Sequence, residues 1–409
     1  MKSDWKWKTA LFLTSQAVSL FGSSLVQFAI VWFVTLKTSS GFWVSMLTVS
    51  AYLPQFLISF FAGVWADRHS KKLLIITADS SIALTTLVLA LLFPHIADHT
   101  VLLALLLLVS AIRSIGTGIQ TPAVSAMIPG LVPEDQLMRV NGINSTIQSI
   151  VQFAAPAAAG VVLTFQTLRI TLFIDIATAV VGITLLSFVK IPAMDKEVQS
   201  EKTTVLFELL TGVKYAFSDR FLRILLVVNG IFIFLCVPAG FLATLYVSRT
   251  YGDSYSYLAV VELVGFAGMT AGGILIGAWG GFENRMKTLI VGILLFGVLA
   301  IGMGAAGNFL LYLILMFLYG IALTMVQTAT TTLLQEKSRP EMQGRIFGFF
   351  GAIYSACLPI GMVVFGPLSD AVPMQGIMVA SGVALVLLGL CYTRVSQKSR
   401  CSHYYESGH

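Results

Sequence analysis

Residues 63–72 read GVWADRHSKK, and in this stretch a long apolar run ends in an acid, Asp67, and a cluster of basic side chains. Arg68 follows the acid directly, and Lys71 and Lys72 follow within five residues of it. An apolar segment that ends in Lys and Arg is typical of a helix that leaves a membrane on its cytoplasmic side. If so, the rest of the chain must supply further segments of the same kind.

The composition of the chain predicts a membrane protein. Of its 409 residues, 57% are hydrophobic and 11% are charged, whereas about a quarter are charged in an ordinary soluble domain. A helix needs about 20 apolar residues to cross the roughly 30 Å of hydrocarbon in a bilayer, and such runs recur along the whole chain. We therefore predict an all-α membrane protein with twelve spans, over residues 9–36, 42–66, 73–93, 100–128, 143–166, 171–189, 221–247, 256–280, 288–306, 309–333, 346–368 and 375–393.

The distribution of basic residues predicts the topology. All but four of the 25 Lys and Arg residues lie on the cytoplasmic side if both termini are cytoplasmic. Lys37, Arg169 and Arg249 would be outside, and Arg113 lies within a span. The net charge of +6 is therefore an insertion signal, and we expect no nucleic-acid partner. The first apolar run is too long for a signal peptide, so we expect it to be the first span.

Histidine and cysteine positions argue against an enzyme or a metal site. All five histidines fall in predicted loops or in the tail, and the four cysteines fall on three spans and the tail. These positions allow neither a Ser/His/Asp triad nor a helical zinc-binding His pair at membrane depth. The sequence has no G-x-x-x-x-G-K-[ST] loop, so ATP-driven transport would need a separate ATP-binding protein as a partner.

Two halves of the chain resemble each other. GVWADRHSKK has a counterpart in GAWGGFENRMK at 277–287, and PEDQLMRVNG at 133–142 has one in PEMQGRIFG at 340–348. A long polar segment with an amphipathic stretch separates the halves. Parallel repeats of this kind place a transport site near the bilayer midplane between them. We predict an N-terminal six-helix bundle over 1–190, a cytoplasmic linker with an amphipathic helix over 191–220, a C-terminal six-helix bundle over 221–393 and a cytoplasmic tail over 394–409.

The pattern Gly63-x-x-x-Asp67-Arg68-x-x-Lys71-Lys72, between spans two and three of twelve, resembles the signature loop of the major facilitator superfamily. A serine replaces the usual second glycine of that loop. The resemblance covers the whole chain. It implies two pseudo-symmetric six-helix bundles that transport a substrate by alternating access.

The signature loop is predicted to act as a latch on the cytoplasmic side. Gly63 would let the second span approach a neighbouring helix, and Asp67 could bind the positive N-terminal end of the eleventh span. Arg68 could reach an acid at the end of span four, Glu134 or Asp135. Such contacts would exist in only one state of the cycle and would bias it. The alternative is that the basic residues only mark the cytoplasmic side.

Four further stretches resemble the macrolide-efflux proteins of the drug:proton antiporter group: QAVSLFGS, RSIGTGIQTPA, LVPEDQL and LLQEKSRPEMQGRIF. This resemblance implies export of macrolide antibiotics across the bacterial inner membrane, driven by the proton-motive force and without a cofactor. Two patterns depart from the group. The glycines after Arg113 come one residue early, and the proline-glycine pattern of span five is reduced to Ala155-Pro156-x-x-Ala159-Gly160, which weakens an inference of antiport from motif alone. The alternative is a transporter of the same superfamily for another amphiphile, such as a lipid, a peptide or another drug.

Four ionisable residues are predicted at membrane depth, namely Asp79, Arg113, Asp175 and Glu262. Burying a charge in a bilayer is costly, so such residues are functional candidates by default. The resemblance implies that Arg113 is the proton-coupling arginine of span four, which would act on a nearby acid. Spans three and six are usually peripheral in this fold. We therefore expect Asp79 and Asp175 to be structural acids satisfied by neighbouring helices, with a functional role as the alternative.

Glu262 is the only acid in a predicted span of the C-terminal half and lies about 12 Å from the outer end of its helix. Low-dielectric surroundings favour the neutral form of a carboxyl, so Glu262 could take a proton from outside and release it inside. It could equally bind the amine of a cationic drug. A buried acid with a structural role is the third interpretation.

Prolines and glycines mark candidate hinges and interfaces. Pro156 and Pro359 lie in the equivalent spans five and eleven, where each can kink its helix. Gly268, Gly272 and Gly277 recur along span eight at a spacing that permits close helix contact. That contact could be static packing or a sliding surface between the halves.

Overall fold

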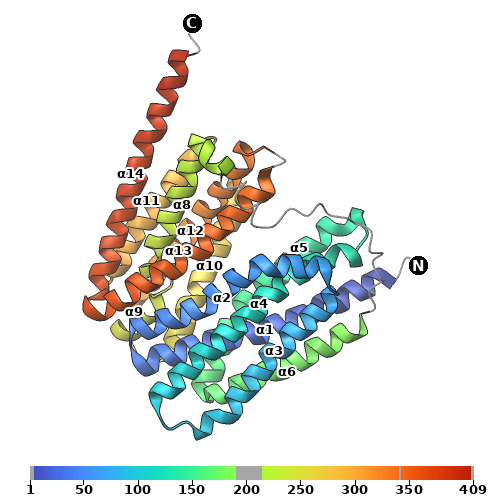
Figure 1. The fold of residues 1–409 in the computed structure, drawn as a ribbon. Helices are drawn as coiled ribbons and strands as arrows, with labels where there is room; N and C mark the ends of the chain where they lie inside the picture. The colour runs from blue at the N-terminus through green and yellow to red at the C-terminus, as the bar shows by residue number, and fades with distance from the viewer. Residues whose placement is uncertain (1–3, 190–213, 340–341, 407–409) are drawn as a thin grey trace. The chain divides into compact units, whose positions relative to one another are not determined.

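The computed structural model describes residues 4–189, 214–339 and 342–406, so most of the expected amphipathic linker lies outside the described residues. Regular structure in these ranges is helical, without a β-strand (Figure 1). The first half contains α1 (Asp4–Thr38), α2 (Gly41–Arg68), α3 (Lys71–Leu92), η1 (Phe93–His95), α4 (His99–Leu131), η2 (Glu134–Gln136), α5 (Leu137–Phe165) and α6 (Leu168–Phe188). The second half contains α8 (Arg220–Gly240), α9 (Ala243–Thr250), α10 (Tyr255–Trp279), α11 (Arg285–Gly304), α12 (Phe309–Lys337), α13 (Gln343–Ala371) and α14 (Met374–Glu406).

Twelve segments of the described chain are long and apolar enough to cross a membrane, as the sequence predicts, with α8 and α9 together forming one. Helices suit this role because every backbone N–H and C=O in hydrocarbon must be satisfied within its own segment. Polar side chains start several helices sharply after short loops. Asp98 accepts a hydrogen bond from the backbone N–H of Thr100 at 2.7 Å, and Asp219 accepts one from that of Phe221 at 2.8 Å.

Contacts divide the chain into two compact units. The first comprises Met1–Ser39, Trp43–Phe207 and Asp253–Val260, and the second comprises Ser40–Phe42, Glu208–Gly252 and Val261–His409. In the first unit α1 packs against α5 and α6, and α3 against α4 and α6; in the second, α8 packs against α13 and α14, and α11 against α12 and α14. Equivalent spans therefore pack in both units, which confirms the predicted pair of six-helix bundles. Pro156 and Pro359 occupy the equivalent helices α5 and α13, and both helices continue through their prolines.

Two segments differ from the expected spans. The seventh, expected as one helix over 221–247, is two helices, because α8 ends at Gly240 and α9 begins at Ala243. Pro238 lacks a backbone N–H and glycine is a poor helix former, so the helix breaks where the two occur together. The last helix, α14, continues into the expected tail as far as Glu406, because no glycine or proline interrupts the end of its sequence.

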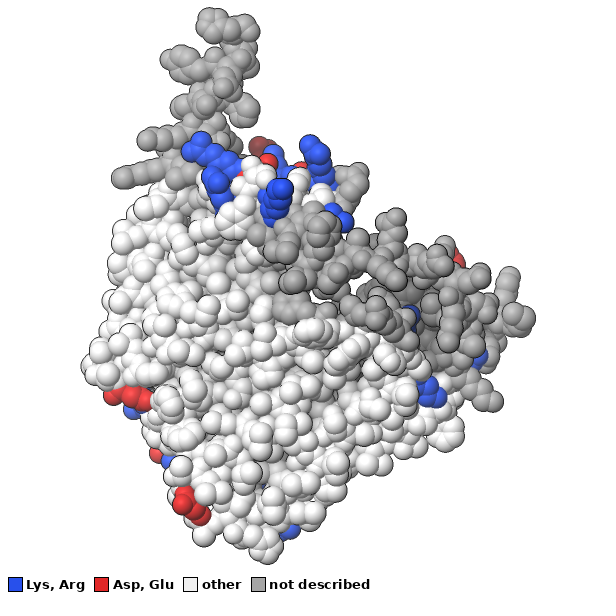
Figure 2. Space-filling view, in the orientation of Figure 1, with Lys and Arg blue, Asp and Glu red and all other residues white. Residues whose placement is uncertain are grey.

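Charged side chains of the second unit gather at its helix ends. Arg220 and Arg223 start α8, Arg285 and Lys287 start α11, and Lys337 ends α12. Figure 2 shows basic side chains gathered over this end and a broad surface below it without Lys, Arg, Asp or Glu. An apolar surface bounded by charges is what a bilayer requires of a membrane-spanning bundle.

Candidate functional site

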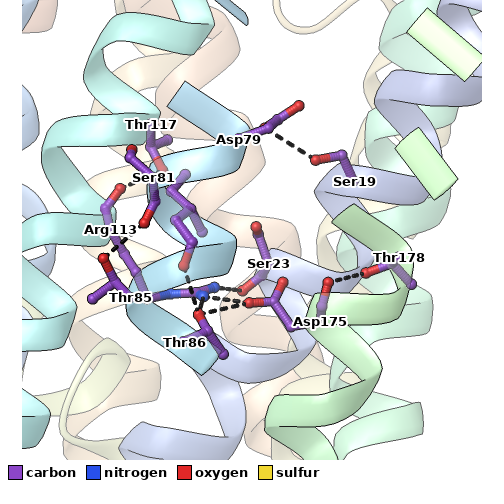
Figure 3. A network of polar contacts seen from close by, with 11 residues as sticks. Ser19, Ser23, Asp79, Ser81, Thr85, Thr86, Arg113, Thr117, Asp175 and Thr178 are labelled. Atoms are coloured by element: carbon purple, nitrogen blue, oxygen red, sulfur yellow. Dashed lines mark hydrogen bonds and ion pairs between the residues drawn. The ribbon is translucent and has the colours of Figure 1, made fainter. Parts of the chain in front are cut away.

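A network of buried polar side chains lies inside the first unit, on α1, α3, α4 and α6 (Figure 3). Arg113 on α4 and Asp175 on α6 form an ion pair, and their side chains are 5% and 1% exposed. The Thr86 hydroxyl on α3 accepts a hydrogen bond from Arg113 and donates one to Asp175 at 3.1 Å. The second terminal nitrogen of Arg113 donates to the Ser23 carbonyl on α1 at 3.2 Å. The positive charge of Arg113 is therefore compensated within its own bundle.

Helix α1 approaches α6 closely beside this ion pair. A Cβ added at Gly22 would lie 1.8 Å from the Thr178 hydroxyl and 3.2 Å from the Asp175 carboxylate, so a larger residue would separate the two helices. Gly22 and Ser19 belong to the stretch QAVSLFGS, which the sequence marks only by its family resemblance. The signal for their structural role is the spacing of small residues along one face of a helix.

Asp79 on α3 is the second buried acid of the first unit, and its side chain is 3% exposed. Its Oδ1 atom accepts hydrogen bonds from the Ser19 hydroxyl on α1 at 3.1 Å and from the Gln120 amide on α4 at 2.7 Å. Neighbouring helices thus satisfy Asp79, but no basic side chain in the described ranges forms an ion pair with it. No group of three or more His, Cys, Asp or Glu residues that could hold a metal ion occurs there either.

The segment RSIGTGIQ, residues 113–120, also fixes α4 to α2. The Ser114 hydroxyl accepts a hydrogen bond from the backbone N–H of Gln55 at 2.9 Å and donates one to the carbonyl of Ala51 at 2.6 Å. In an uninterrupted helix that N–H and that carbonyl would bond to each other. The Ser114 hydroxyl is therefore inserted into the backbone of α2, directly after Pro54.

Glu262 lies on α10 in the second unit, near a cluster of tyrosines. Its side chain is half-buried, and no donor in the described chain hydrogen-bonds to its carboxyl. Tyr312 of α12 lies near this carboxyl, and its buried hydroxyl also has no hydrogen-bond partner among the described residues. The Tyr312 ring stacks on Tyr246 of α9 with centroids 5.4 Å apart, and Tyr251 lies 5.5 Å from it. A carboxyl that accepts no hydrogen bond can take up a proton or an organic cation.

The glycines of α10 divide into two kinds. A Cβ at Gly268 would lie 2.1 Å from the Phe317 carbonyl oxygen, and one at Gly272 would lie 2.9 Å from the Ile321 Cα, both on α12. These two glycines pack α10 on α12 within the second unit, which favours static packing over a sliding surface. A Cβ at Gly277 would meet no described atom within 4 Å, so Gly277 does not make the close contact that its spacing predicts.

The signature loop joins α2 to α3. Ser70 caps α3, and its hydroxyl accepts a backbone hydrogen bond from the first turn, so the serine supplies an N-cap where the family has glycine. The Lys72 ammonium donates to the carbonyls of Ser187 and Val189 at 2.7 and 2.9 Å, where the end of α6 favours a positive charge. Lys72 therefore has a structural role that the sequence did not suggest.

The predicted latch function of the signature loop stays a prediction. The surroundings of Gly63 and the side chains of Asp67 and Arg68 lie outside what the structure describes. Lys71 begins α3.

A half-exposed ion pair that the sequence did not single out lies at the end of α13. Asp370 pairs with Arg249 of α9 at 2.6 Å, and Arg249 also donates to the Ser369 carbonyl at 2.6 Å. The same carboxylate accepts hydrogen bonds from the backbone N–H groups of Gly41 and Phe42 at 2.7 and 2.9 Å. Both residues belong to the second unit. Asp370 thus binds the positive N-terminal end of α2.

Twelve spans in two duplicated bundles, with ionisable side chains at membrane depth, define a multi-pass membrane transporter. The sequence profile of the Major Facilitator Superfamily matches residues 12–362 and 239–400, and the chain belongs to this superfamily.

Relatives with a named activity are similar over most of the chain. Macrolide efflux protein A of Streptococcus pyogenes is 29% identical over 398 residues, which cover 97% of each chain. Macrolide efflux protein A of Enterococcus faecalis is 30% identical over 319 residues, 77% of this chain and 98% of the relative. These similarities confirm the resemblance that the sequence indicated.

Solved transporters share the fold at low sequence identity. A bacterial homologue of the human lysosomal transporter Spinster, in an inward-facing and unoccupied conformation, aligns with a TM-score of 0.74 and 15% identity, over 97% of this chain and 98% of its own. The crystal structure of a point mutant of the nucleoside transporter NupG aligns with a TM-score of 0.73 and 15% identity, over 95% of this chain and 99% of its own.

Proposed function

We propose that the protein is a proton-coupled exporter of macrolide antibiotics that works by alternating access between its two bundles. The similarity to macrolide efflux protein A over 97% of both chains is the observation that carries the proposal. The buried ionisable groups support it, because export against a gradient needs side chains that can change their charge inside the membrane. The proton-motive force supplies the energy, and no cofactor is required.

Glu262 is the coupling acid in this proposal. Its carboxyl has no donor in the described chain, so a proton or a drug amine can bind it without breaking an existing hydrogen bond. Macrolides carry an amine, and the ionised Glu262 carboxyl offers an acceptor for it. Because one carboxyl cannot hold both cations at once, proton entry would release the drug. Competition of this kind gives antiport in a carrier that changes its access state only with a proton or a drug bound.

Arg113 has a supporting role. Asp175 and Thr86 hold its guanidinium in one position, and its positive charge balances the Asp175 carboxylate inside the first bundle. Loss of that charge should disable uphill export. The signature loop, through Asp67, would stabilise the state in which the cytoplasmic side is closed.

We place the protein in the bacterial cytoplasmic membrane, with both termini in the cytoplasm. The excess of Lys and Arg in the corresponding segments supports this orientation, and the named relatives are bacterial. Its ligands are a small hydrophobic drug and protons, its solvent is the lipid bilayer, and we expect no nucleic-acid partner. A separate ATP-binding protein is the alternative energy source.

Drug accumulation in an efflux-deficient bacterium tests the proposal. Expression should lower erythromycin accumulation, a protonophore should abolish the effect, and Glu262→Gln at the same membrane level should behave as an inactive control. Unchanged erythromycin accumulation with the protein present in the membrane would show that the substrate is another amphiphile, such as a lipid, a peptide or another drug. Export that survives the protonophore and stops on ATP depletion would show that an ATP-binding partner, and not the proton gradient, supplies the energy.

A further inference from the structure

We propose that Asp79 is a second proton-binding carboxyl of this transporter, in addition to Glu262, and that two protons are exchanged for each drug molecule. The stoichiometry rests on the proposed proton coupling. The presence of a proton on Asp79 does not, because it follows from the surroundings of this side chain in the first unit.

The hydrogen bonds of Asp79 leave one oxygen available for a proton. Both donors, the Ser19 hydroxyl and the Gln120 amide, are uncharged, and both bond to Oδ1. This leaves Oδ2 without a donor in the described chain. A carboxylic acid with Oδ1 as its carbonyl oxygen and the proton on Oδ2 fits the arrangement.

The charges around α3 are already balanced without Asp79. The charged groups that neighbouring helices present closest to Asp79 are Arg113 of α4 and Asp175 of α6, which form an ion pair at Thr86, seven residues and about 10 Å further along α3. At the level of Asp79 itself, α1 contributes an uncharged serine. Arg169 of α6 lies toward the other end of α3, where it donates to the Ala90 carbonyl at 3.1 Å. An ionised Asp79 would be a buried charge without a counter-ion. The proton on Asp79 removes this cost.

Release of this proton requires a change of surroundings that the contacts of Asp79 can provide. Gln120 is half-buried and reaches Asp79 from α4, the helix that also carries Arg113. Water at Oδ2, or a shift of α4 that brings its arginine closer to Asp79, would favour the ionised form. The proton would then leave Asp79 in one state of the transport cycle and return in the other.

Infrared spectroscopy of the purified protein in lipid tests the proton directly and needs no drug. In a Glu262→Gln background, the protein should show the C=O stretching band of a protonated buried carboxyl at neutral pH. Asp79→Asn should remove this band. Gln120→Leu, which deletes a donor to the carbonyl oxygen, should keep the band and shift it to higher frequency. No band in the background protein, or a band unchanged by Asp79→Asn, would overturn the proposal.

The balance between pH gradient and drug gradient tests the stoichiometry. In proteoliposomes at zero membrane potential, each coupled proton supports about a tenfold drug gradient per pH unit. The wild type should therefore sustain about a hundredfold erythromycin gradient per pH unit, and Asp79→Asn about a tenfold gradient. Equal gradients for both proteins would show that the Asp79 proton is not coupled. If the wild type sustains no erythromycin gradient, the proposed function is refuted. The infrared experiment would still decide whether Asp79 carries a proton.

Discussion

The ion pair between Arg113 and Asp175 allows a quantitative prediction for the variant Asp175→Asn. The substitution keeps the size of the side chain but removes its charge, so the Arg113 guanidinium is left without a counter-ion. The site is buried, since the side chains of Arg113 and Asp175 are 5% and 1% exposed. Breaking a buried pair from one side typically costs about 3–5 kcal/mol. At about 1.4 kcal/mol for each factor of ten, the folded state of Asp175→Asn should be destabilised roughly a hundredfold or more.

A double variant separates charge from packing. Arg113→Met with Asp175→Leu replaces both charges by apolar side chains of similar volume, which is often neutral or stabilising for a buried pair. We expect the double variant to recover most of the stability lost in Asp175→Asn, yet to remain unable to export drug uphill. Unfolding of the purified proteins in mixed micelles, monitored by tryptophan fluorescence, measures the differences. Wild-type stability in Asp175→Asn would show that the pair does not hold these helices together.

Five further substitutions test other parts of the proposal. Glu262→Gln should abolish proton-driven export in proteoliposomes and retain some downhill drug movement, whereas gradient-driven transport in this variant would remove Glu262 as the coupling acid. Asp67→Asn should reduce transport far more than membrane expression, and normal transport would leave the loop as a topology signal only. Gly268→Ala should lower the stability of the fold by about 1–3 kcal/mol, because its Cβ would lie 2.1 Å from a backbone oxygen of α12. Gly277→Ala is the control, since its Cβ would meet no described atom within 4 Å, and it should have the melting temperature of the wild type. Equal losses of stability in the two variants would contradict the packing described. Asp370→Asn should cost about 1 kcal/mol through its bonds to the start of α2, and an unchanged melting temperature would show that these bonds are not stabilising.

The twelve spans could be predicted from sequence because hydrocarbon imposes one requirement on every segment, a long apolar helix. The break in the seventh span was missed because Pro238 and Gly240 lie in an apolar run, and hydrophobicity alone does not distinguish a kinked helix from a broken one. The end of α14 was missed for the opposite reason, since a polar helix that leaves the membrane has no hydrophobic signal.

The buried acids and arginine could also be found in the sequence, because charges are rare in membrane spans. The ion pair that two of them form could not be predicted from the sequence. Arg113 and Asp175 are 62 positions apart, and nothing in a single sequence shows that they meet and leave Asp79 with uncharged donors. The contacts of Ser19 and Gln120 are equally hidden, since such residues commonly bond to their own helix or to lipid-facing neighbours.

The hydroxyl of Ser114 has a mechanical consequence. It connects two points on the backbone of α2 to α4, with bonds of 2.9 and 2.6 Å, so the two helices cannot slide without losing both bonds at once. A shift by a single turn would be about 5.4 Å, far beyond the length of a hydrogen bond. We therefore expect α2 and α4 to move together during transport, and a pair of distance probes attached to them should report a constant separation while the substrate crosses the membrane.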